Sequence, residues 1–165
     1  MKKVSFSEME CSVAQSLEVI GEWWTLLIIR DAFFGVTRFE QFQERLGIAR
    51  NVLTTRLDTL VEHEVLERRS YDDARERYDY VLTDKGKALW PVLTTLRDWG
   101  DEWIVGKGHE PVQMLHKSCG ETTHGELHCE HCGEKLLRRD LRMVAGPGLV
   151  DPDFLPTPTR FHSLS

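Results

Sequence analysis

The sequence predicts a mainly α fold with a small β-hairpin (α+β), followed by a separate C-terminal module. Three observations lead to this fold class. Hydrophobic residues recur at helical spacing through most of the first hundred positions. Two β-prone runs flank a polar tip at residues 72–77, which is typical of a hairpin. Three of the four cysteines and four of the seven histidines fall within residues 116–133, which indicates a site of its own.

A chain of 165 residues with 41% hydrophobic residues usually forms one domain with a core plus a small appendage. The longest strongly apolar run, residues 26–29, is far shorter than the roughly 20 residues that span a bilayer. No apolar stretch like a secretory signal follows Lys2 and Lys3. We therefore expect a cytoplasmic protein without a membrane partner, whose thiols are mostly reduced.

The first two helices are predicted near the N-terminus. Residues 12–20 carry Val13, Leu17 and Ile20 at helical spacing, and Gly21 ends this segment. Residues 23–34 are apolar on almost every face, as expected of a central helix that others surround, and end at Gly35.

Residues 37–69 predict two further helices separated by a tight turn. Phe39, Phe42 and Leu46 mark the first helix, the turn is Gly47-Ile48-Ala49, and the second buries its leucines, Leu53, Leu57 and Leu60. This arrangement is a helix-turn-helix. On geometry alone, any three-helix bundle would fit equally well.

The hairpin that follows favours the first alternative. Residues 65–71 and 78–82 are rich in β-prone side chains and enclose the polar tip. A hairpin placed directly after a helix-turn-helix is a wing, so the sequence predicts a winged helix-turn-helix.

Thr83 is expected to cap one long helix that Pro91 bends. Its broad apolar stripe comprises Leu89, Val92, Leu93, Leu96, Trp99 and Trp103. A stripe of this width needs a partner after the small core is closed, and a second copy of the chain in a two-fold dimer is the simplest one. The alternative is that the stripe folds onto its own domain.

Residues 11–100 resemble the HxlR-type (MarR-like) winged-helix transcription regulators of bacteria. The shared motifs are the N-terminal cysteine, IGEWWTLLIIRD, the RF dipeptide, YVLTDKG and WPVL. This resemblance implies a homodimeric, sequence-specific transcription regulator, with repression as the expected mode, that binds an inverted repeat in double-stranded DNA. A small-molecule or oxidant effector is part of the same expectation, and no catalytic residues are expected.

The winged-helix geometry assigns roles to individual residues. The second helix of the motif enters the major groove and presents its N-terminal side chains to base edges. We therefore expect base contacts from Arg50, Asn51, Thr54 and Thr55. Phosphate contacts are expected from Arg38 and Arg56, and wing contacts from Arg75 and Arg77.

The net charge of −6 argues against a nucleic-acid partner, but four arginines and only two acids between residues 37 and 56 make that surface locally basic. The wing is more balanced, and its tip lacks the prolines that related proteins often carry. For any single exposed arginine the alternative is a solvated face. An alternative for the whole chain is a protein-interaction adaptor that keeps the winged-helix fold without binding DNA.

Cys11 precedes the first helix, where the helix dipole and free amides favour a thiolate. Several members of the resembled family sense oxidants with a cysteine at this place, although Ser12 stands where they commonly have proline. The alternative is that Cys11 is a small, half-buried packing residue.

His116-x-x-Cys119-Gly and Cys129-x-x-Cys132-Gly repeat one pattern, in which two ligands are separated by two residues and followed by glycine. This spacing turns both side chains toward one ion in zinc ribbons. We expect a structural Zn²⁺ bound by His116, Cys119, Cys129 and Cys132. The alternatives are a redox-active or metal-sensing cluster, or no site, and the histidine could be replaced by His109, His124, His128 or His131.

His124-Gly-Glu126 followed by Cys129-x-x-Cys132 superficially resembles the zinc deaminases. In those enzymes the two halves lie on separate helices beside a substrate pocket. Two residues between Glu126 and Cys129 leave too little chain for this, so we do not expect an enzyme.

The expected organisation has three parts. Residues 1–105 form the winged-helix and dimerisation domain, residues 106–143 form the zinc-ribbon-like module, and residues 144–165 form a tail rich in proline and glycine.

Overall fold

The computed structural model describes residues 5–72 and 77–151 of the chain. These residues divide into two compact units, Val19–Glu126 and a second unit that combines Met1–Glu18 with Leu127–Ser165. This division falls between the two Cys-containing turns, so each turn is described by itself. The boundaries predicted at residues 105 and 143 stay a prediction.

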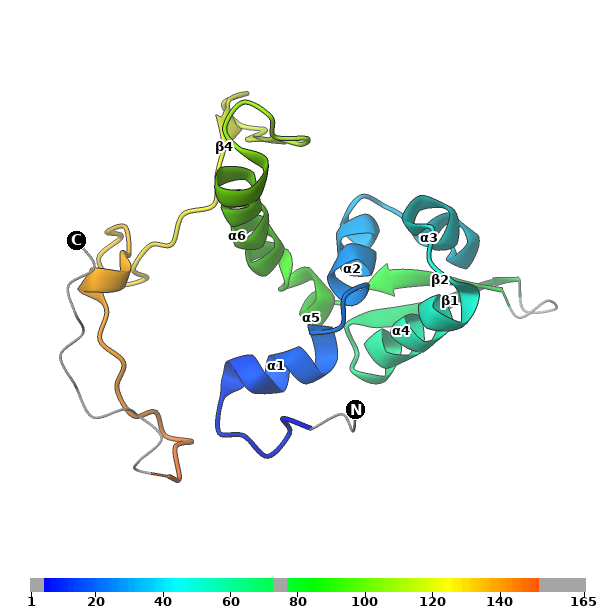
Figure 1. The fold of residues 1–165 in the computed structure, drawn as a ribbon, viewed down its shortest axis with the longest axis horizontal. Coiled ribbons are helices and arrows are strands. Elements are labelled where there is room, and N and C mark those ends of the chain that lie inside the picture. The colour runs from blue at the N-terminus through cyan, green and yellow to red at the C-terminus, as the bar shows by residue number, and fades with distance from the viewer. Residues whose placement is uncertain (1–4, 73–76, 152–165) are drawn as a thin grey trace. The chain divides into compact units, whose positions relative to one another are not determined.

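Three helices and a two-stranded sheet form the core of the larger unit (Figure 1). The helices are α2 (Thr25–Phe33), α3 (Phe39–Leu46) and α4 (Arg50–Glu62). Their inward residues are fully or almost fully buried and include Ile28, Ile29, Phe42, Leu53, Leu57 and Leu60. The predicted face of α4 is therefore the buried one.

The turn between α3 and α4 ends the first helix as predicted. Gly47 adopts φ 61°, a left-handed conformation that glycine takes at little cost, and its N–H donates to the carbonyl of Gln43 at 2.9 Å. Ile48 is buried directly behind it. The helix-turn-helix inferred from the sequence is confirmed.

The predicted hairpin forms the antiparallel sheet β1 (Leu66–Asp72) and β2 (Arg77–Leu82), with Leu66 opposite Leu82 and Ser70 opposite Tyr78. The tip, residues 73–76, lies outside the described residues. β1 packs against α4 and β2 against α2 and α3. A helical bundle with this small sheet matches the predicted fold class.

The junction between α4 and the hairpin is tightly bonded. Glu64 adopts φ 57°, a left-handed conformation that is uncommon for a residue with a side chain. The N–H of Val65 donates to the carbonyl of Leu60 at 2.8 Å, and the Thr83 hydroxyl donates to the carbonyl of Glu64 at 2.6 Å. One threonine thus connects the end of β2 to the start of β1.

The single long helix predicted after Thr83 is wrong in detail. The Thr83 hydroxyl caps a short helix, α5 (Asp84–Lys87), by accepting from the N–H of Gly86 at 3.1 Å. A second helix, α6 (Trp90–Gly100), then begins with Pro91 in its first turn. Proline is tolerated there because the first-turn N–H has no helical partner, so Pro91 begins a helix rather than bending one.

α6 continues into a π-helical turn, η2 (Asp101–Val105), and α1 (Ser12–Ile20) spans the boundary between the two units. Trp23, expected inside the second helix, precedes α2 and is 91% exposed. Among the described residues, the helices are too short or too polar to cross a bilayer.

Residues 106–143 contain two small hairpins, which belong to different units. The first pairs β3 (Met114–Leu115) with β4 (Thr122–Thr123), and the second is marked by a bridge between His128 and Lys135. A 3-10 turn, η3 (Arg138–Asp140), follows. No side chain from Glu102 to Asp151 is fully buried.

Candidate nucleic-acid interface

The outer face of α4 carries the four residues predicted to contact bases. Arg50, Asn51, Thr54 and Thr55 are all exposed, while Leu53 and Leu57 on the opposite face are fully buried. The structure therefore brings these four side chains together on one solvent-facing surface. A helix with only short or flexible polar groups on its outer face fits the width of a major groove.

Arg50 is positioned by an aromatic neighbour. Its guanidinium carbon lies 4.7 Å from the centre of the Phe39 ring, at the start of α3. Such cation–π contacts are worth about 0.5–1 kcal/mol at exposed sites. They restrict the side chain without using its hydrogen-bond donors.

The two threonines bond back onto their own helix. Thr54 Oγ1 donates to the carbonyl of Arg50, and Thr55 Oγ1 donates to the carbonyl of Asn51, both at 3.0 Å. Each hydroxyl proton is therefore engaged, and the outward side of each oxygen is an acceptor with a methyl group beside it.

Arg38 lies where α3 meets the wing. Its guanidinium is 4.7 Å from the centre of the Tyr71 ring, and its Nε is 3.8 Å from Asp79 Oδ1. The adjacent Thr37 accepts the N–H of Tyr80 at 2.7 Å and donates its hydroxyl to Asp79 at 2.8 Å. An exposed cation is thus held at the junction of two elements.

Arg56 differs from the other candidates. Only 21% of its side chain is exposed, and its Nη2 lies 3.1 Å from Glu22 Oε2, before α2. This ion pair joins α4 to the segment in front of α2. Of the two predicted phosphate contacts, Arg56 has the shorter ion pair and Arg38 the longer one, at 3.8 Å from Asp79.

A buried carboxylate that sequence reasoning missed orients α3 against α2. Asp31 is fully buried and accepts from Arg30 Nε at 2.9 Å and from Arg45 Nε at 3.2 Å. Because Arg45 belongs to α3, this contact fixes the first helix of the motif. The available signal was an acid within an otherwise apolar helix, which demands a charged partner when buried.

Two arginines of the wing were predicted to contact DNA, and the structure describes one of them. Arg77 is exposed at the start of β2, whereas Arg75 falls in the tip outside them. Arg68 forms an ion pair with Asp58, on the outer side of α4, and so connects the hairpin to α4.

Cys11 immediately precedes α1, and its carbonyl accepts the N–H of Gln15 at 2.9 Å. The thiol is free and half-buried. This position agrees both with the sensing hypothesis and with the packing alternative.

The predicted metal ligands lie in the turns of the two C-terminal hairpins. His116 Nδ1 is 3.2 Å from Cys119 Sγ in the first turn, and Cys129 and Cys132 lie in the second. Within residues 5–72 and 77–151, no three His, Cys, Asp or Glu side chains gather as a metal site. The two turns belong to different units, so the four-ligand set stays a prediction.

The chain is similar to known regulators over most of its length. An uncharacterised HTH-type transcriptional regulator of Mycobacterium tuberculosis is 43% identical over 137 residues, which cover 83% of this chain and 87% of the relative. The HTH-type regulator YodB of Bacillus subtilis is 30% identical over 89 residues, covering 53% of this chain and 80% of the relative.

Solved structures show the same relationship. PA1607, a proposed transcription factor, aligns with a TM-score of 0.77 and 36% identity, over 87% of this chain and 100% of that chain. The reduced form of YodB aligns with a TM-score of 0.50 and 31% identity, over 58% and 96%. The model of the family described as HxlR-like helix-turn-helix matches residues 19–108, more than half of the sequence. The chain therefore belongs to the HxlR-like helix-turn-helix family of transcriptional regulators.

Proposed function

We propose that this regulator is a homodimeric repressor that binds an inverted repeat in duplex DNA through α4. The observation that carries the proposal is the outer face of α4, where Arg50, Asn51, Thr54 and Thr55 are exposed above a buried leucine face. In winged helices, this element presents its N-terminal residues to the major groove.

The chemistry of that face suits base recognition. Arginine pairs bidentately with guanine, and asparagine pairs bidentately with adenine. Because the hydroxyl protons of Thr54 and Thr55 bond to the helix, their oxygens accept and their methyl groups contact thymine.

Arg38 is assigned to the phosphate backbone. It is exposed at the start of α3, and its pairing distance to Asp79, 3.8 Å, is at the long limit for an ion pair. A phosphate can therefore replace this carboxylate as its partner. Backbone contacts of this kind set the register of the protein on the duplex without sequence preference.

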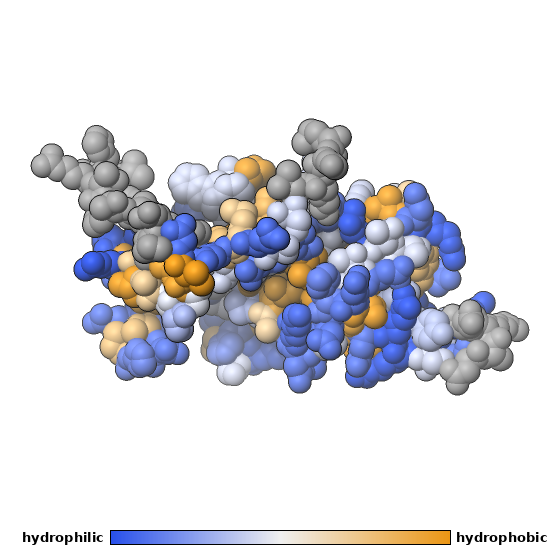
Figure 2. Space-filling view, turned by 90° about the horizontal axis from the view of Figure 1, so that it is seen from below, coloured by the Kyte–Doolittle hydropathy of each residue, from blue (hydrophilic) through white to orange (hydrophobic). Residues whose placement is uncertain are grey.

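The homodimer is proposed from α6. Leu96, Trp99 and Trp103 are 47%, 53% and 67% exposed, so this part of the predicted stripe is not covered by its own unit, whereas Leu89 and Leu93 pack against the core. Hydrophobic residues (orange) also reach the surface in Figure 2. A second copy would cover this stripe, and a two-fold dimer would place two recognition helices about one DNA turn apart, roughly 34 Å.

The test is a footprint on the DNA upstream of the protein's own gene, followed by binding titrations with the protected site and with random duplex. Arg50→Ala and Asn51→Ala should each cost about 1–3 kcal/mol on the specific site and relax base preference. Arg38→Ala should weaken both duplexes alike and reduce the salt dependence.

Arg142→Ala is the matched control, because Arg142 is an exposed arginine outside the winged helix. It should bind as the parent protein does. Equal losses on both duplexes for all three interface variants would contradict the assignment of base contacts. Absence of any footprint at low salt would favour the protein-interaction adaptor instead.

A redox input through Cys11 is a second proposal, supported by its place at the start of α1 and by the similarity to the reduced form of YodB. Oxidation of a half-buried thiol at a helix start adds a polar group or a bridge there. Diamide should release the parent protein from DNA and leave Cys11→Ser bound. Release of both proteins alike would rule out this input.

A further inference from the structure

The start of α3 is bonded to the hairpin of β1 and β2 through its backbone. The carbonyl of Thr37 accepts the N–H of Tyr80 at 2.7 Å, and Arg38 forms an antiparallel bridge with Asp79. Asp79 Oδ1 in turn accepts the hydroxyl of Thr37 at 2.8 Å. The backbone of Arg38 is therefore fixed against β2 in the protein without DNA.

The side chain of Arg38 is 54% exposed but has two neighbours in the hairpin. Its guanidinium carbon lies 4.7 Å from the centre of the Tyr71 ring, and its Nε lies 3.8 Å from Asp79 Oδ1. A contact with a ring uses no hydrogen-bond donor. The terminal amino groups of Arg38 can therefore still donate to a phosphate, which arginine binds through paired donors.

Tyr71 lies at an irregularity of the hairpin. Ser70 pairs with Tyr78 and Asp72 pairs with Arg77, so Tyr71 is an extra residue of β1 at a shift of register. A bulge of this kind bends the strand and redirects a side chain. From this bulge the ring of Tyr71 contacts Arg38.

The hydrophobic core does not account for the ring of Tyr71. Tyr80, on the other strand, packs against the core, whereas Tyr71 is 41% exposed. An exposed ring next to an exposed guanidinium contributes little to burial of apolar surface. The contact therefore restrains the arginine rather than completing the core.

An arginine that is restrained before it binds loses less on binding. The side chain of an exposed arginine samples many rotamers, and this freedom is lost when a phosphate fixes it. A contact that already restricts the side chain in the free protein reduces that loss. Affinity for DNA then rises without a further contact to the duplex.

We propose that Tyr71 is a positioning residue for DNA binding, whose ring holds the guanidinium of Arg38 where it meets a phosphate. The hairpin then adds to affinity through an arginine that belongs to the start of α3. This inference rests on the proposed function, because it needs a duplex bound through α4. In the alternative, the hydroxyl of Tyr71 itself bonds to a phosphate.

A second pair of the same kind provides an independent reference. The guanidinium of Arg50 lies 4.7 Å from the centre of the Phe39 ring, so the two cation–π pairs share no residue. A change at Tyr71 should therefore depend on the presence of Arg38 and not on that of Arg50.

The experiment is a double-mutant cycle on the full-length protein, with affinity measured for random duplex and for the site protected in the footprint. Tyr71→Leu should weaken binding to both by about two- to fivefold, the loss expected for an exposed cation–π contact. The two losses should be alike, because phosphates carry no sequence information. Tyr71→Leu should cause no further loss in the Arg38→Ala background and the full loss in the Arg50→Ala background.

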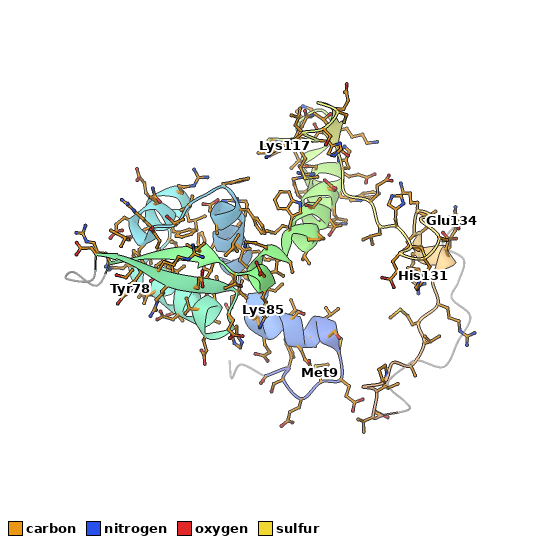
Figure 3. The ribbon with its side chains drawn as sticks, turned by 180° about the vertical axis from the view of Figure 1, so that it is seen from behind. Met9, Tyr78, Lys85, Lys117, His131 and Glu134 are labelled. Carbon is orange, nitrogen blue, oxygen red and sulfur yellow. The ribbon has the colours of Figure 1, made fainter. Side chains whose placement is uncertain are left out.

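Conservative variants separate the ring from the hydroxyl. Tyr71→Phe and Tyr71→Trp keep an aromatic ring and should bind as the parent protein does. Tyr78→Leu is the matched control, because Tyr78 is a tyrosine of the same hairpin, 37% exposed and labelled near its free end in Figure 3. It should also bind as the parent does. A loss of affinity in Tyr71→Phe would show that the hydroxyl contacts DNA and would overturn the proposal.

The contact between the two side chains is tested without DNA. The ring current of Tyr71 should shift the side-chain proton resonances of Arg38 in NMR spectra, and this shift should persist in Tyr71→Phe and vanish in Tyr71→Leu. Far-UV circular dichroism checks that each variant is folded.

The outcomes distinguish this inference from the function on which it rests. Equal losses from Tyr71→Leu with and without Arg38 would overturn the positioning role and leave DNA binding through α4 intact. A parent protein that binds neither duplex would contradict both.

Discussion

Gly86 lies where α5 touches the wing, and no larger residue fits there. A Cβ at this position would lie 2.2 Å from the carbonyl oxygen of Val65 and 2.9 Å from Leu82 Cδ2. The first neighbour is backbone, which cannot rotate away. The motif YVLTDKG therefore ends in a residue that the packing demands.

Gly86→Ala should destabilise the protein by about 1–3 kcal/mol, because the added methyl group overpacks the site by more than the helix gains from alanine. The midpoint of urea unfolding measures this loss. Gly100→Ala is the control, since no atom lies within 4 Å of a Cβ there. Its midpoint should stay level or rise, and an equal fall in both variants would contradict the steric argument.

Asp98 supports a prediction about pH. Burial raises the pKa of its carboxyl group, but hydrogen bonds from Arg97, the N–H of Gly125 and His124, together with the charge of Arg97, outweigh burial and lower the pKa below 3.8. The ionised form is thus the one that holds the first hairpin to α6. Its contribution to stability is present above the unfolded pKa and is lost as the pH falls through the folded value.

Hydrogen exchange at the Gly125 amide should therefore accelerate as the pH is lowered from about 5 to 3, relative to the intrinsic rate. Because acid also protonates other groups in the protein, Asp98→Asn serves as the reference. This variant should exchange faster at pH 6 and lose the part of the pH dependence that comes from the carboxylate. Identical profiles for the two proteins would show that Asp98 does not hold the hairpin.

At the scale of the elements, helical periodicity predicted the two helices of the motif, and the β-prone runs of the hairpin favoured a winged helix-turn-helix over a three-helix bundle. Leucines at helical spacing gave α4 its buried face, and Gly47 marked the turn. The segment after Thr83 was predicted less well, because a repeating apolar pattern does not show where a helix is interrupted. Pro91 was predicted to bend a continuous helix, although proline is also favoured in the first turn of a helix.

The charge partners could not be predicted, since they join elements that are far apart in the sequence. Arg56 is paired with Glu22 and Arg45 with Asp31, so two of the four arginines counted between residues 37 and 56 are compensated inside the fold. The positive charge available to a ligand is thus concentrated at Arg38 and Arg50. Their aromatic neighbours, Tyr71 and Phe39, were likewise visible only in the structure.

Asp31→Asn should lower the free energy of unfolding by about 1.5–3 kcal/mol, because charged hydrogen bonds between α2 and α3 are lost. The side chains of Arg30 and Arg45 are 42% and 50% exposed, so in the variant their charges can be hydrated by water, which limits the loss of stability. Asp84→Asn, at a fully exposed carboxylate, should leave stability almost unchanged. Chemical unfolding measures the free energy of unfolding of both variants. Equal losses would show that Asp31 does not stabilise the contact between α2 and α3.

At the scale of the whole molecule, one face of α6 is covered by the first hairpin and another is exposed. Thr94 and Asp98 face the first hairpin, whereas Leu96, Trp99 and Trp103 are left exposed. The sequence predicted the stripe but not the division, because the contacts between α6 and this hairpin join residues that are 20 to 27 positions apart in the sequence.

Trp99→Glu should convert the proposed dimer into monomers, because a charge cannot be buried in an apolar interface without a partner. Sedimentation velocity measures the change, and affinity for the inverted repeat should fall with it. Met143→Glu places the same charge at a hydrophobic residue that is 74% exposed outside α6, and should leave the assembly intact. A parent protein that sediments as a monomer at micromolar concentration would remove the basis for a two-fold complex.

The hydrogen-bonded junction at Glu64 and Thr83 limits how an effector could change DNA binding. Because it fastens α4 to the wing, and Asp79 fastens the wing to α3, we expect these three elements to move together in each subunit of the proposed dimer. An allosteric signal then has little freedom to reshape a single half-site. If the proposed dimer responds to an effector, we expect the effector to change the separation or rotation of the two subunits and to leave the distances within each winged helix unchanged.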